Sequence, residues 1–218
     1  MRDLRVGLVG YGMSGRDFHA PLLRRADGLR LTHVVTGDPG RAAQAVEDDS
    51  RVRVMPTVAD LLAHAASLDL VVIASASNVH VEQASAVVER GLPVVVDKPL
   101  ATDETSGRGL VDLAERRQVP LTVFQNRRWD SEHLTARSLL GSGVLGELVR
   151  YEARYERWRP EPKSRWRENA SSEQGGGLLM DLQSHLVDGA LDLFGPVEAV
   201  YAELQAVTTA ADDVTFLV

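Results

Sequence analysis

Three glycines near the N-terminus lie between an apolar run and a helical pattern. Gly10, Gly12 and Gly15 have the spacing G-x-G-x-x-G, after residues 4–9 and before residues 14–25. In this setting the first glycine permits a tight turn, the second lets the backbone approach a pyrophosphate, and the third allows close helix packing. The N–H groups of the helix N-terminus favour phosphate. The run therefore predicts a dinucleotide site, with an ordinary glycine turn as the alternative.

Apolar segments and helical patterns alternate through the first 125 residues. Short runs rich in branched apolar residues, typical of strands buried on both faces, lie at residues 4–10, 31–36, 70–74, 92–96 and 120–124. Helical spacing follows at residues 14–25, 41–47, 58–66, 79–90 and 104–117. Candidate N-caps are Thr57, Asn78 and Thr102. Since parallel neighbours need crossover connections, residues 1–125 are predicted to form a doubly wound parallel sheet of the Rossmann type.

The pattern changes after Phe124. Residues 147–158 alternate apolar and charged side chains, which predicts a half-exposed antiparallel strand. A helix is predicted over residues 178–194, before Gly195 and Pro196, and a strand over residues 213–218. Residues 126–218 are therefore expected to form an α+β domain with a mainly antiparallel open sheet, so that the whole chain is an α/β protein of two domains.

Composition and charge exclude several kinds of site. The 218 residues contain no cysteine, so disulfides and thiolate metal ligands are excluded, and no metal site is predicted. A net charge of −7 argues against nucleic acid as a partner, and glutamates interleave the arginines of residues 150–167. No apolar run approaches membrane-spanning length and no signal-peptide core is evident. We expect a soluble, cytoplasmic protein.

Two groups of side chains suggest chemistry. Asp181, His185, Asp188 and Asp192 recur at spacings of four, three and four, which aligns them on one helix face. They form either a solvated acidic stripe or, with a histidine beside a carboxylate, a general acid/base pair. Lys98 follows an apolar strand pattern, at the edge where open α/β sheets bind ligands. It either extends into solvent or supplies positive charge to a developing alkoxide.

Several motifs occur in one order along nearly the whole chain. The glycine run G-Y-G-M-S-G-R is followed by F-H-A-P, A-S-A-S-N-V-H, D-K-P-L, F-Q-N-R-R-W-D, Trp166-Arg167 and G-G-G-L-L-M-D-L-Q-S-H-L-V-D. Together they resemble the glucose–fructose oxidoreductase/inositol dehydrogenase/rhizopine catabolism (Gfo/Idh/MocA) oxidoreductases. The resemblance implies an NAD(P)-dependent enzyme that moves a hydride between the nicotinamide and a hydroxyl carbon of a sugar, polyol or related compound. A non-catalytic NAD(P)-binding regulator or inactive paralogue is the alternative.

The resemblance also implies residue roles. Lys98, Asp181 and His185 match the catalytic residues of the family: His185 would take the hydroxyl proton, Lys98 would polarise the oxygen, and Asp181 would orient substrate or histidine. The residues that match cofactor-lining positions are Gly10, Tyr11, Gly12, Met13, Gly15, Thr36, Asp38, Arg41, Ser75, Asn78, His80, Asp97, Lys98 and Asn126.

The residues after the second predicted strand bear on the choice of cofactor. An acidic side chain at the strand end would bind the ribose diol and repel a 2′-phosphate. Gly37 occupies that place, and Asp38 follows one residue later. Thr36 and Arg41 are suited to a 2′-phosphate, so the sequence leans slightly towards NADP over NAD.

The chain departs from the family pattern at three places. Asp97 replaces a glutamate, Gln183 replaces a glycine, and the sequence stops within a strand pattern, whereas family members continue through more strands. The second domain is therefore expected to be incomplete: either the chain is a fragment, or a partner covers the unpaired strand edge. The open sheet of the family implies a homo-oligomer, a dimer or tetramer.

Overall fold

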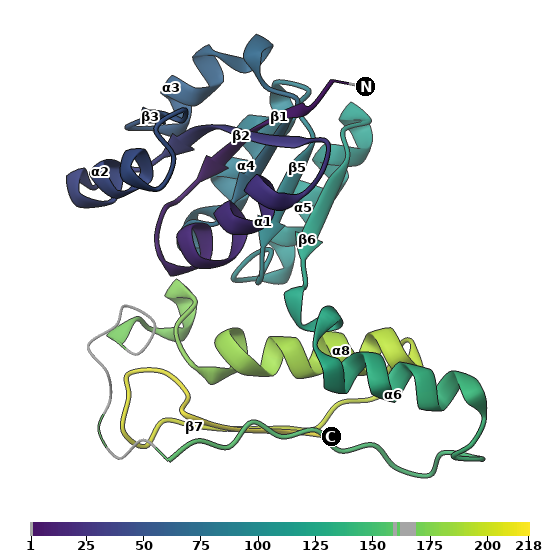
Figure 1. Cartoon of the computed structure of the whole chain (residues 1–218). Helices are drawn as coiled ribbons and strands as arrows, with labels where there is room; N and C mark the ends of the chain where they lie inside the picture. The colour runs from purple at the N-terminus through teal and green to yellow at the C-terminus, as the bar shows by residue number, and fades with distance from the viewer. Residues whose placement is uncertain (1, 159–160, 162–168) are drawn as a thin grey trace. The chain divides into compact units, whose positions relative to one another are not determined.

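The computed structural model describes residues 2–158, 161 and 169–218. The chain divides into two compact units, Met1–Phe124 and Gln125–Val218, which we call unit 1 and unit 2. Figure 1 shows the helices and strands of each unit. No helix in these described ranges is long and apolar enough to cross a membrane. Trp166 and Arg167, which contribute to the sequence resemblance, lie outside the described residues.

Unit 1 contains a six-stranded sheet in the order β3-β2-β1-β4-β5-β6. Every neighbouring pair is parallel, which confirms the predicted Rossmann-type architecture. The strands are β1 (Leu4–Val9), β2 (Leu29–Val35), β3 (Arg53–Met55), β4 (Leu70–Ile73), β5 (Val94–Asp97) and β6 (Leu121–Phe124). The edge strand β3 escapes the sequence pattern because its three residues begin with an arginine and form no apolar run.

Helices connect these strands. They are η1 (Ser14–His19), α1 (Ala20–Arg25), α2 (Pro39–Asp48), α3 (Val58–Ala63), η2 (Ala65–Ser67), η3 (Ser77–Val79), α4 (His80–Glu89) and α5 (Glu104–Arg117). Thr57 caps α3, as predicted. The other two cap predictions are wrong: Asn78 lies inside η3, which leads directly into α4, and Asp103 rather than Thr102 accepts the N–H of Ser106 at the start of α5.

The core of unit 1 has two parts because β-strand side chains alternate between faces. On one face, Leu8 and Val34 pack with residues of α1 and α2 such as Ala20 and Ala45. On the other face, the strand residues Val9, Val71, Ile73, Val94 and Val96 pack with side chains of α3, α4 and α5. Continuous apolar strands are therefore covered on both sides, as a doubly wound sheet requires.

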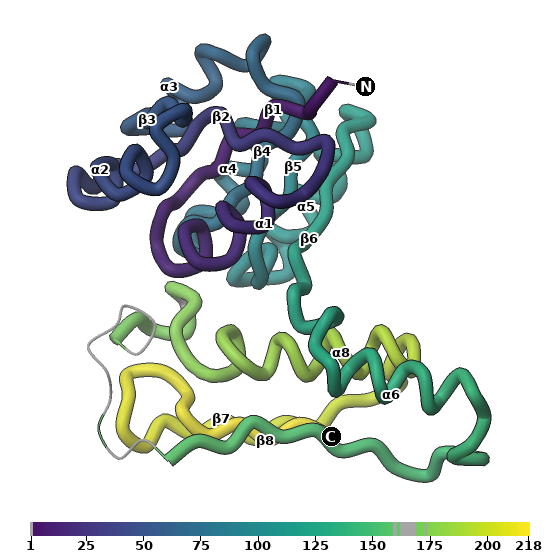
Figure 2. Tube along the Cα trace, in the orientation of Figure 1, coloured from purple at the N-terminus to yellow at the C-terminus, as the bar shows by residue number. Residues whose placement is uncertain are grey.

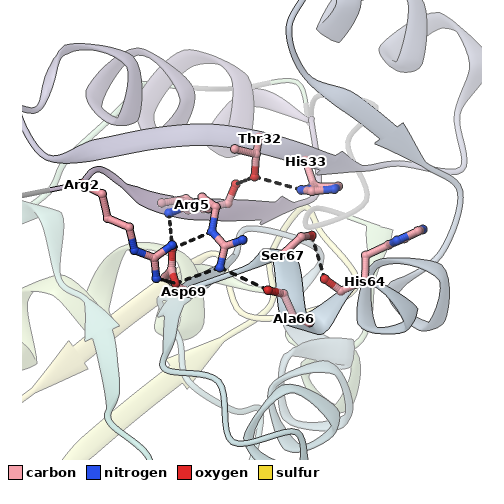
Figure 3. Close-up of polar contacts among 9 residues, drawn as sticks. Arg2, Arg5, Thr32, His33, His64, Ala66, Ser67 and Asp69 are labelled. Carbon is pink, nitrogen blue, oxygen red and sulfur yellow. Dashed lines mark hydrogen bonds and ion pairs between the residues drawn. The ribbon is translucent and has the colours of Figure 1, made fainter.

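Charged side chains join the beginning of β1 to the turn before β4 (Figure 3). The Asp69 carboxylate accepts the backbone N–H of Arg5 at 2.8 Å and its guanidinium Nε at 2.9 Å. Arg2 donates to the same carboxylate at 3.0 Å. Hydrogen bonds from Arg5 hold the pKa of Asp69 well below its usual value. This ion pair fixes the amino ends of two central strands, opposite the edge that carries the glycine loop.

The described part of unit 2 contains helices and a two-stranded sheet, whose strands lie side by side in Figure 2. The described elements are η4 (Asn126–Trp129), α6 (Ser131–Ser142), η5 (Ser172–Gln174), η6 (Leu179–Gln183), α8 (Ser184–Phe194), β7 (Ala202–Gln205) and β8 (Val214–Leu217). The predicted helix over residues 178–194 is present as a π-helical segment, η6, followed by α8. β7 and β8 pair antiparallel, and β8 matches the predicted terminal strand.

The strand predicted over residues 147–158 is wrong, because the described part of unit 2 shows no backbone ladder there. Its alternating charges pair along the segment itself. Glu152 contacts both Arg150 and Arg154, and Arg154 lies 3.8 Å from Glu156. Period-two charge alternation therefore reflects local ion pairing in an extended chain and not cross-strand pairing.

Candidate nucleotide and catalytic site

The glycine loop lies where the strand order reverses direction, between β1 and β4. Open α/β sheets bind ligands outside the carboxyl ends of strands at such a point. Gly10 has a φ of +94°, and a Cβ there would lie 2.6 Å from the carbonyl oxygen of Ala74, directly after β4. A Cβ on Gly15 would overlap the carbonyl oxygen of Gly10. Gly10 therefore lets the loops after β1 and β4 meet, and Gly15 lets η1 begin close against the backbone of its own loop.

The space above Gly12 is open. Among the described residues, a Cβ built on Gly12 would have only the Arg41 guanidinium within 4 Å, with Nη1 at 3.8 Å. Met13, which precedes η1, is 57% exposed, and no side chain caps the N-terminus of this helix. Uncapped N–H groups beneath an open glycine backbone fit the pyrophosphate of a dinucleotide.

Tyr11 contributes its backbone to this loop, because its side chain is directed into the core. The ring is 2% exposed, and its hydroxyl donates to Asp48 Oδ2 at 3.0 Å and accepts from Arg24 at 3.1 Å. Burial, together with the Asp48 hydrogen bond, raises the pKa of Tyr11 to about 12. Hydrogen bonds from Arg16 and others lower the pKa of Asp48 to about 2. The network ties the glycine loop to the end of α2.

The residues after β2 separate into two roles. Asp38 is the N-cap of α2, and its Oδ1 accepts the N–H of Arg41 at 2.8 Å. Its own N–H donates to Thr36 Oγ1 at 3.3 Å. The Arg41 guanidinium, by contrast, lies beside Gly12. The Asp38 carboxylate therefore caps the N-terminus of α2, whereas the positively charged side chain of Arg41 lies beside the glycine loop.

The loop after β4 holds two of its predicted cofactor residues internally. Ser75 Oγ donates to Gln83 Oε1 at 2.7 Å, and the His80 ring is 1% exposed. Asn78 is exposed in η3. Of these three residues, Asn78 has the side chain most accessible to a ligand.

Asp97 links the glycine loop to the lysine that follows it. Its Oδ2 accepts the hydroxyl of Ser14 and lies 3.8 Å from Nε2 of His19, and its Oδ1 accepts the Lys98 N–H at 3.1 Å. Burial opposes ionisation of Asp97, but the contacts with His19 and Ser14 prevail and keep its pKa below the usual value. Sequence reasoning missed Ser14 and His19, although both lie within the quoted motifs G-Y-G-M-S-G-R and F-H-A-P.

In unit 2 the predicted catalytic pair belongs to one continuous helical stretch. Asp181 lies in η6 and is partly exposed, and His185 lies in α8 and is 9% exposed. Asn126, predicted to line the cofactor, is in η4. The buried position of His185 differs from that of an ordinary solvated surface pair.

A buried carboxylate anchors the start of this stretch. Asp212 Oδ2 accepts the N–H of Leu179 at 2.6 Å, and its backbone oxygen accepts the N–H of Leu178 at 2.8 Å. Burial raises the pKa of Asp212. Gly177 has a φ of +92°, and a Cβ there would overlap Asp212 Oδ1. Gly177, the last glycine of the triplet, therefore makes room for Asp212, a residue that sequence reasoning missed.

The other two aspartates of the predicted helix face have structural partners. Asp188 accepts two hydrogen bonds from Arg128, at 2.7 and 2.8 Å. Asp192 accepts from His133 at 2.8 Å and contacts Arg137. The His133 and Arg137 hydrogen bonds hold the pKa of Asp192 below its usual value. This ion-pair network joins α8 to α6 and η4, so Asp188 and Asp192 hold these helices of unit 2 together.

Comparison with known proteins identifies the family. Residues 4–125 match the family described as "Oxidoreductase family, NAD-binding Rossmann fold", and residues 133–218 match the "GFO/IDH/MocA C-terminal domain". The chain belongs to the Gfo/Idh/MocA oxidoreductase family. Sequence resemblance predicted this membership from its motifs, and the matches confirm it.

Three relatives illustrate the similarity. Uncharacterized oxidoreductase YdgJ of Escherichia coli (strain K12) is 38% identical over 193 residues, which cover 88% of this chain and 54% of that protein. The scyllo-inositol 2-dehydrogenase (NADP(+)) IolW of Bacillus subtilis (strain 168) is 34% identical, and the match covers 98% of this chain and 58% of that protein. The structure of the oxidoreductase yvaA from Bacillus subtilis matches with a TM-score of 0.90 and 32% sequence identity. The match covers 99% of this chain and 60% of that chain. The chain thus spans little more than half the length of these curated relatives.

Proposed function

We propose that this protein is an NAD(P)-dependent dehydrogenase acting on CH–OH groups. The observation that carries the proposal is the hydrogen bond from Ser14 to Asp97. It joins the open glycine loop, which fits a pyrophosphate, to the residue immediately before Lys98. A phosphate-binding loop and a strand-end lysine in direct structural connection are suited to a nicotinamide enzyme, because the loop places the dinucleotide and the lysine places a charge.

The proposed division of labour among the side chains follows from their chemistry. The bound nicotinamide would exchange a hydride with the substrate carbon. His185 takes the proton of the substrate hydroxyl, since an imidazole exchanges protons near neutral pH. Lys98 stabilises the negative charge that develops on the substrate oxygen. Asp181, one turn before His185, orients the substrate or the imidazole.

For the substrate, we propose a polyol or sugar with a secondary hydroxyl. The support is the scyllo-inositol 2-dehydrogenase relative, which covers 98% of this chain. A panel of inositols and aldoses, assayed by the change in nicotinamide absorbance, tests this class. Tight cofactor binding without turnover of any member would favour the alternative, a non-catalytic NAD(P)-binding regulator. The cytoplasmic location and the homo-oligomer remain predictions.

For the cofactor, we propose a preference for NADP over NAD. Asp38 is engaged as a helix cap, and the Arg41 guanidinium lies beside the glycine loop. A charge-assisted hydrogen bond to a 2′-phosphate contributes about 1.5–3 kcal/mol, so Arg41→Ala is expected to weaken NADPH binding by about tenfold or more. NADH binding should change by less than about twofold, because NADH lacks that phosphate.

Arg108→Ala is the matched control for this test, since Arg108 is an exposed arginine on α5 that pairs with Glu104 of the same helix at 2.7 Å. It should leave both affinities unchanged in fluorescence titrations with NADPH and NADH. Equal losses of NADPH and NADH binding in Arg41→Ala would refute the 2′-phosphate assignment and leave the dehydrogenase proposal intact.

A further inference from the structure

A side chain in the helical stretch of unit 2 is hydrogen-bonded to the terminal strand. Gln183 is the last residue of η6, two positions after Asp181 and two before His185. Its Oε1 accepts the hydroxyl of Thr215 in β8 at 3.1 Å, and both side chains are partly buried. The family pattern has glycine at this position, which cannot form such a bond. The glutamine therefore attaches the stretch that carries Asp181 and His185 to the sheet.

Thr215 is on the less exposed of the two faces of β8. Strand side chains alternate between faces. In β8, Val214 and Phe216 are 49% and 52% exposed, whereas Thr215 and Leu217 are partly buried. The Thr215 hydroxyl therefore meets Gln183 on the covered side of the strand, where competition from water is reduced.

Asp212 provides a second attachment, at the other end of η6. Its carboxylate accepts the N–H of Leu179, the first residue of η6, at 2.6 Å. Thr215, in the strand that follows Asp212, bonds the last residue of η6, Gln183. Because the two attachments lie at opposite ends of η6, they restrict its rotation about its own axis more than either could alone.

The backbone of η6 makes this rotation important. The Ser184 N–H donates to the carbonyl of Leu179, five positions earlier, as in a π-helix. The Ser184 hydroxyl donates at 2.8 Å to the carbonyl of Met180, which would accept the N–H of Ser184 in an α-helix. Such wide turns are often found at functional sites. A wide turn changes the direction of the side chains after it relative to those before it, so this one sets the angle between Asp181 and His185.

We propose that Gln183 is a positioning residue that, through Thr215, fixes the direction of Asp181 and His185. Each residue turns the chain by about 100° in an α-helix and by somewhat less in a π-helix, so residues two positions apart lie on nearly opposite sides. The bond to β8 therefore holds the side of the helix opposite to Asp181 and His185. The catalytic part of this proposal rests on the proposed function, whereas its structural part concerns the hydrogen bond alone.

A hydrogen-exchange experiment tests the bond without any assumption about activity. Thr215→Val removes the hydroxyl and keeps the shape, whereas Thr215→Ser keeps the hydroxyl and removes a methyl group. A typical hydrogen bond changes a local opening equilibrium by about two- to twelvefold. Amides of residues 179–187 should therefore exchange about two- to twelvefold faster in Thr215→Val, and within about twofold of the wild-type rate in Thr215→Ser. Equal exchange rates in the valine and serine variants would overturn the attachment.

A kinetic experiment tests the positioning of the catalytic pair. Gln183→Met keeps the length of the side chain and removes its amide. Gln183→Met and Thr215→Val should each lower kcat by about tenfold, because small misplacement of a catalytic group has large effects on rate. KM for the substrate should change by less than about twofold. Thr215→Ser is the matched control and should retain kcat within about twofold of wild type.

The double variant tests whether the two side chains act through one bond. Gln183→Met and Thr215→Val remove the same interaction, so the double variant should lose no more kcat than either single variant. Losses that multiply, equal losses in Thr215→Val and Thr215→Ser, or wild-type kcat in both single variants would overturn the positioning role. Circular dichroism verifies that each variant is folded. If the wild-type protein turns over no polyol or sugar, the proposed function fails, and hydrogen exchange still decides whether Thr215 holds η6.

Discussion

Replacing Gly177 with alanine tests the role of this glycine in anchoring the helical stretch that carries Asp181 and His185. The residue has a φ of +92°, and its Cβ would lie 2.8 Å from Asp212 Cγ and closer still to Oδ1. The new methyl group therefore meets a buried carboxylate, and not the end of a flexible exposed side chain. To relieve the overlap, Asp212 must move away from the N–H of Leu179, which it accepts at 2.6 Å.

The expected loss of stability has two parts. A left-handed backbone costs a residue with a Cβ about 1–2 kcal/mol. Loss of a buried hydrogen bond to a carboxylate costs about 1.5–3 kcal/mol. Gly177→Ala is therefore expected to lower the free energy of unfolding of unit 2 by about 3–4 kcal/mol, allowing for partial relaxation.

Urea unfolding followed by tryptophan fluorescence measures this effect, because all three tryptophans lie within residues 125–218. Gly141→Ala is the control: apart from its chain neighbours and the backbone of its own helix α6, no atom of the described residues lies within 4 Å of its Cβ position, so it should stabilise by up to about 1 kcal/mol. The overlap also predicts that the two positions are energetically coupled. Gly177→Ala should lower the free energy of unfolding by less in an Asp212→Ala protein than in the wild-type protein. Additive losses, or a Gly177→Ala protein as stable as wild type, would refute the reasoning.

Two other substitutions test unit 1. Asp48 has a pKa of about 2 in the folded protein against 3.8 as its ordinary value, so it stabilises the fold above pH 4 and loses that contribution as the pH falls towards 2. Asp48→Asn should lower the free energy of unfolding by about 1–2 kcal/mol at pH 7, after allowance for solvent screening, and by close to zero at pH 2. Thermal unfolding followed by circular dichroism measures this difference, and a difference that does not change with pH would contradict the prediction. Gly15→Ala should abolish NADPH binding in fluorescence titrations because its Cβ overlaps the Gly10 carbonyl, and wild-type affinity would contradict the proposed role of the glycine loop.

The fold of unit 1 is predictable from sequence because its strands are buried on both faces and therefore appear as uninterrupted apolar runs. α6 is not predictable in this way. None of its residues is buried, so it lacks the apolar stripe that reveals a helix. Residues 147–158 show the opposite error, because a strand is predicted there and none is found. Their apolar and charged side chains alternate with a period of two, but the charges form ion pairs within the segment and the backbone forms no sheet ladder.

The sequence motifs indicate where the candidate site residues lie along the chain, but they do not indicate which contacts those residues make. Tyr11 is in the glycine loop as expected, but its ring packs in the core, a direction that no local pattern reveals. Asp212 contacts Leu179 from 33 positions away, and the Ser14–Asp97 hydrogen bond spans 83 positions. Such contacts depend on how the strands are ordered, which single-residue patterns do not encode.

The most direct test of the proposed function compares turnover and cofactor binding in the same variants. For Lys98→Ala and His185→Ala, kcat/KM for polyol oxidation should fall by about a hundredfold or more, the usual effect of losing a general acid/base or a charge at the reacting oxygen. The Kd for NADPH should stay within about threefold of wild type, because the glycine loop and Arg41 are unchanged. Undiminished turnover in both variants would contradict the catalytic assignment of Lys98 and His185.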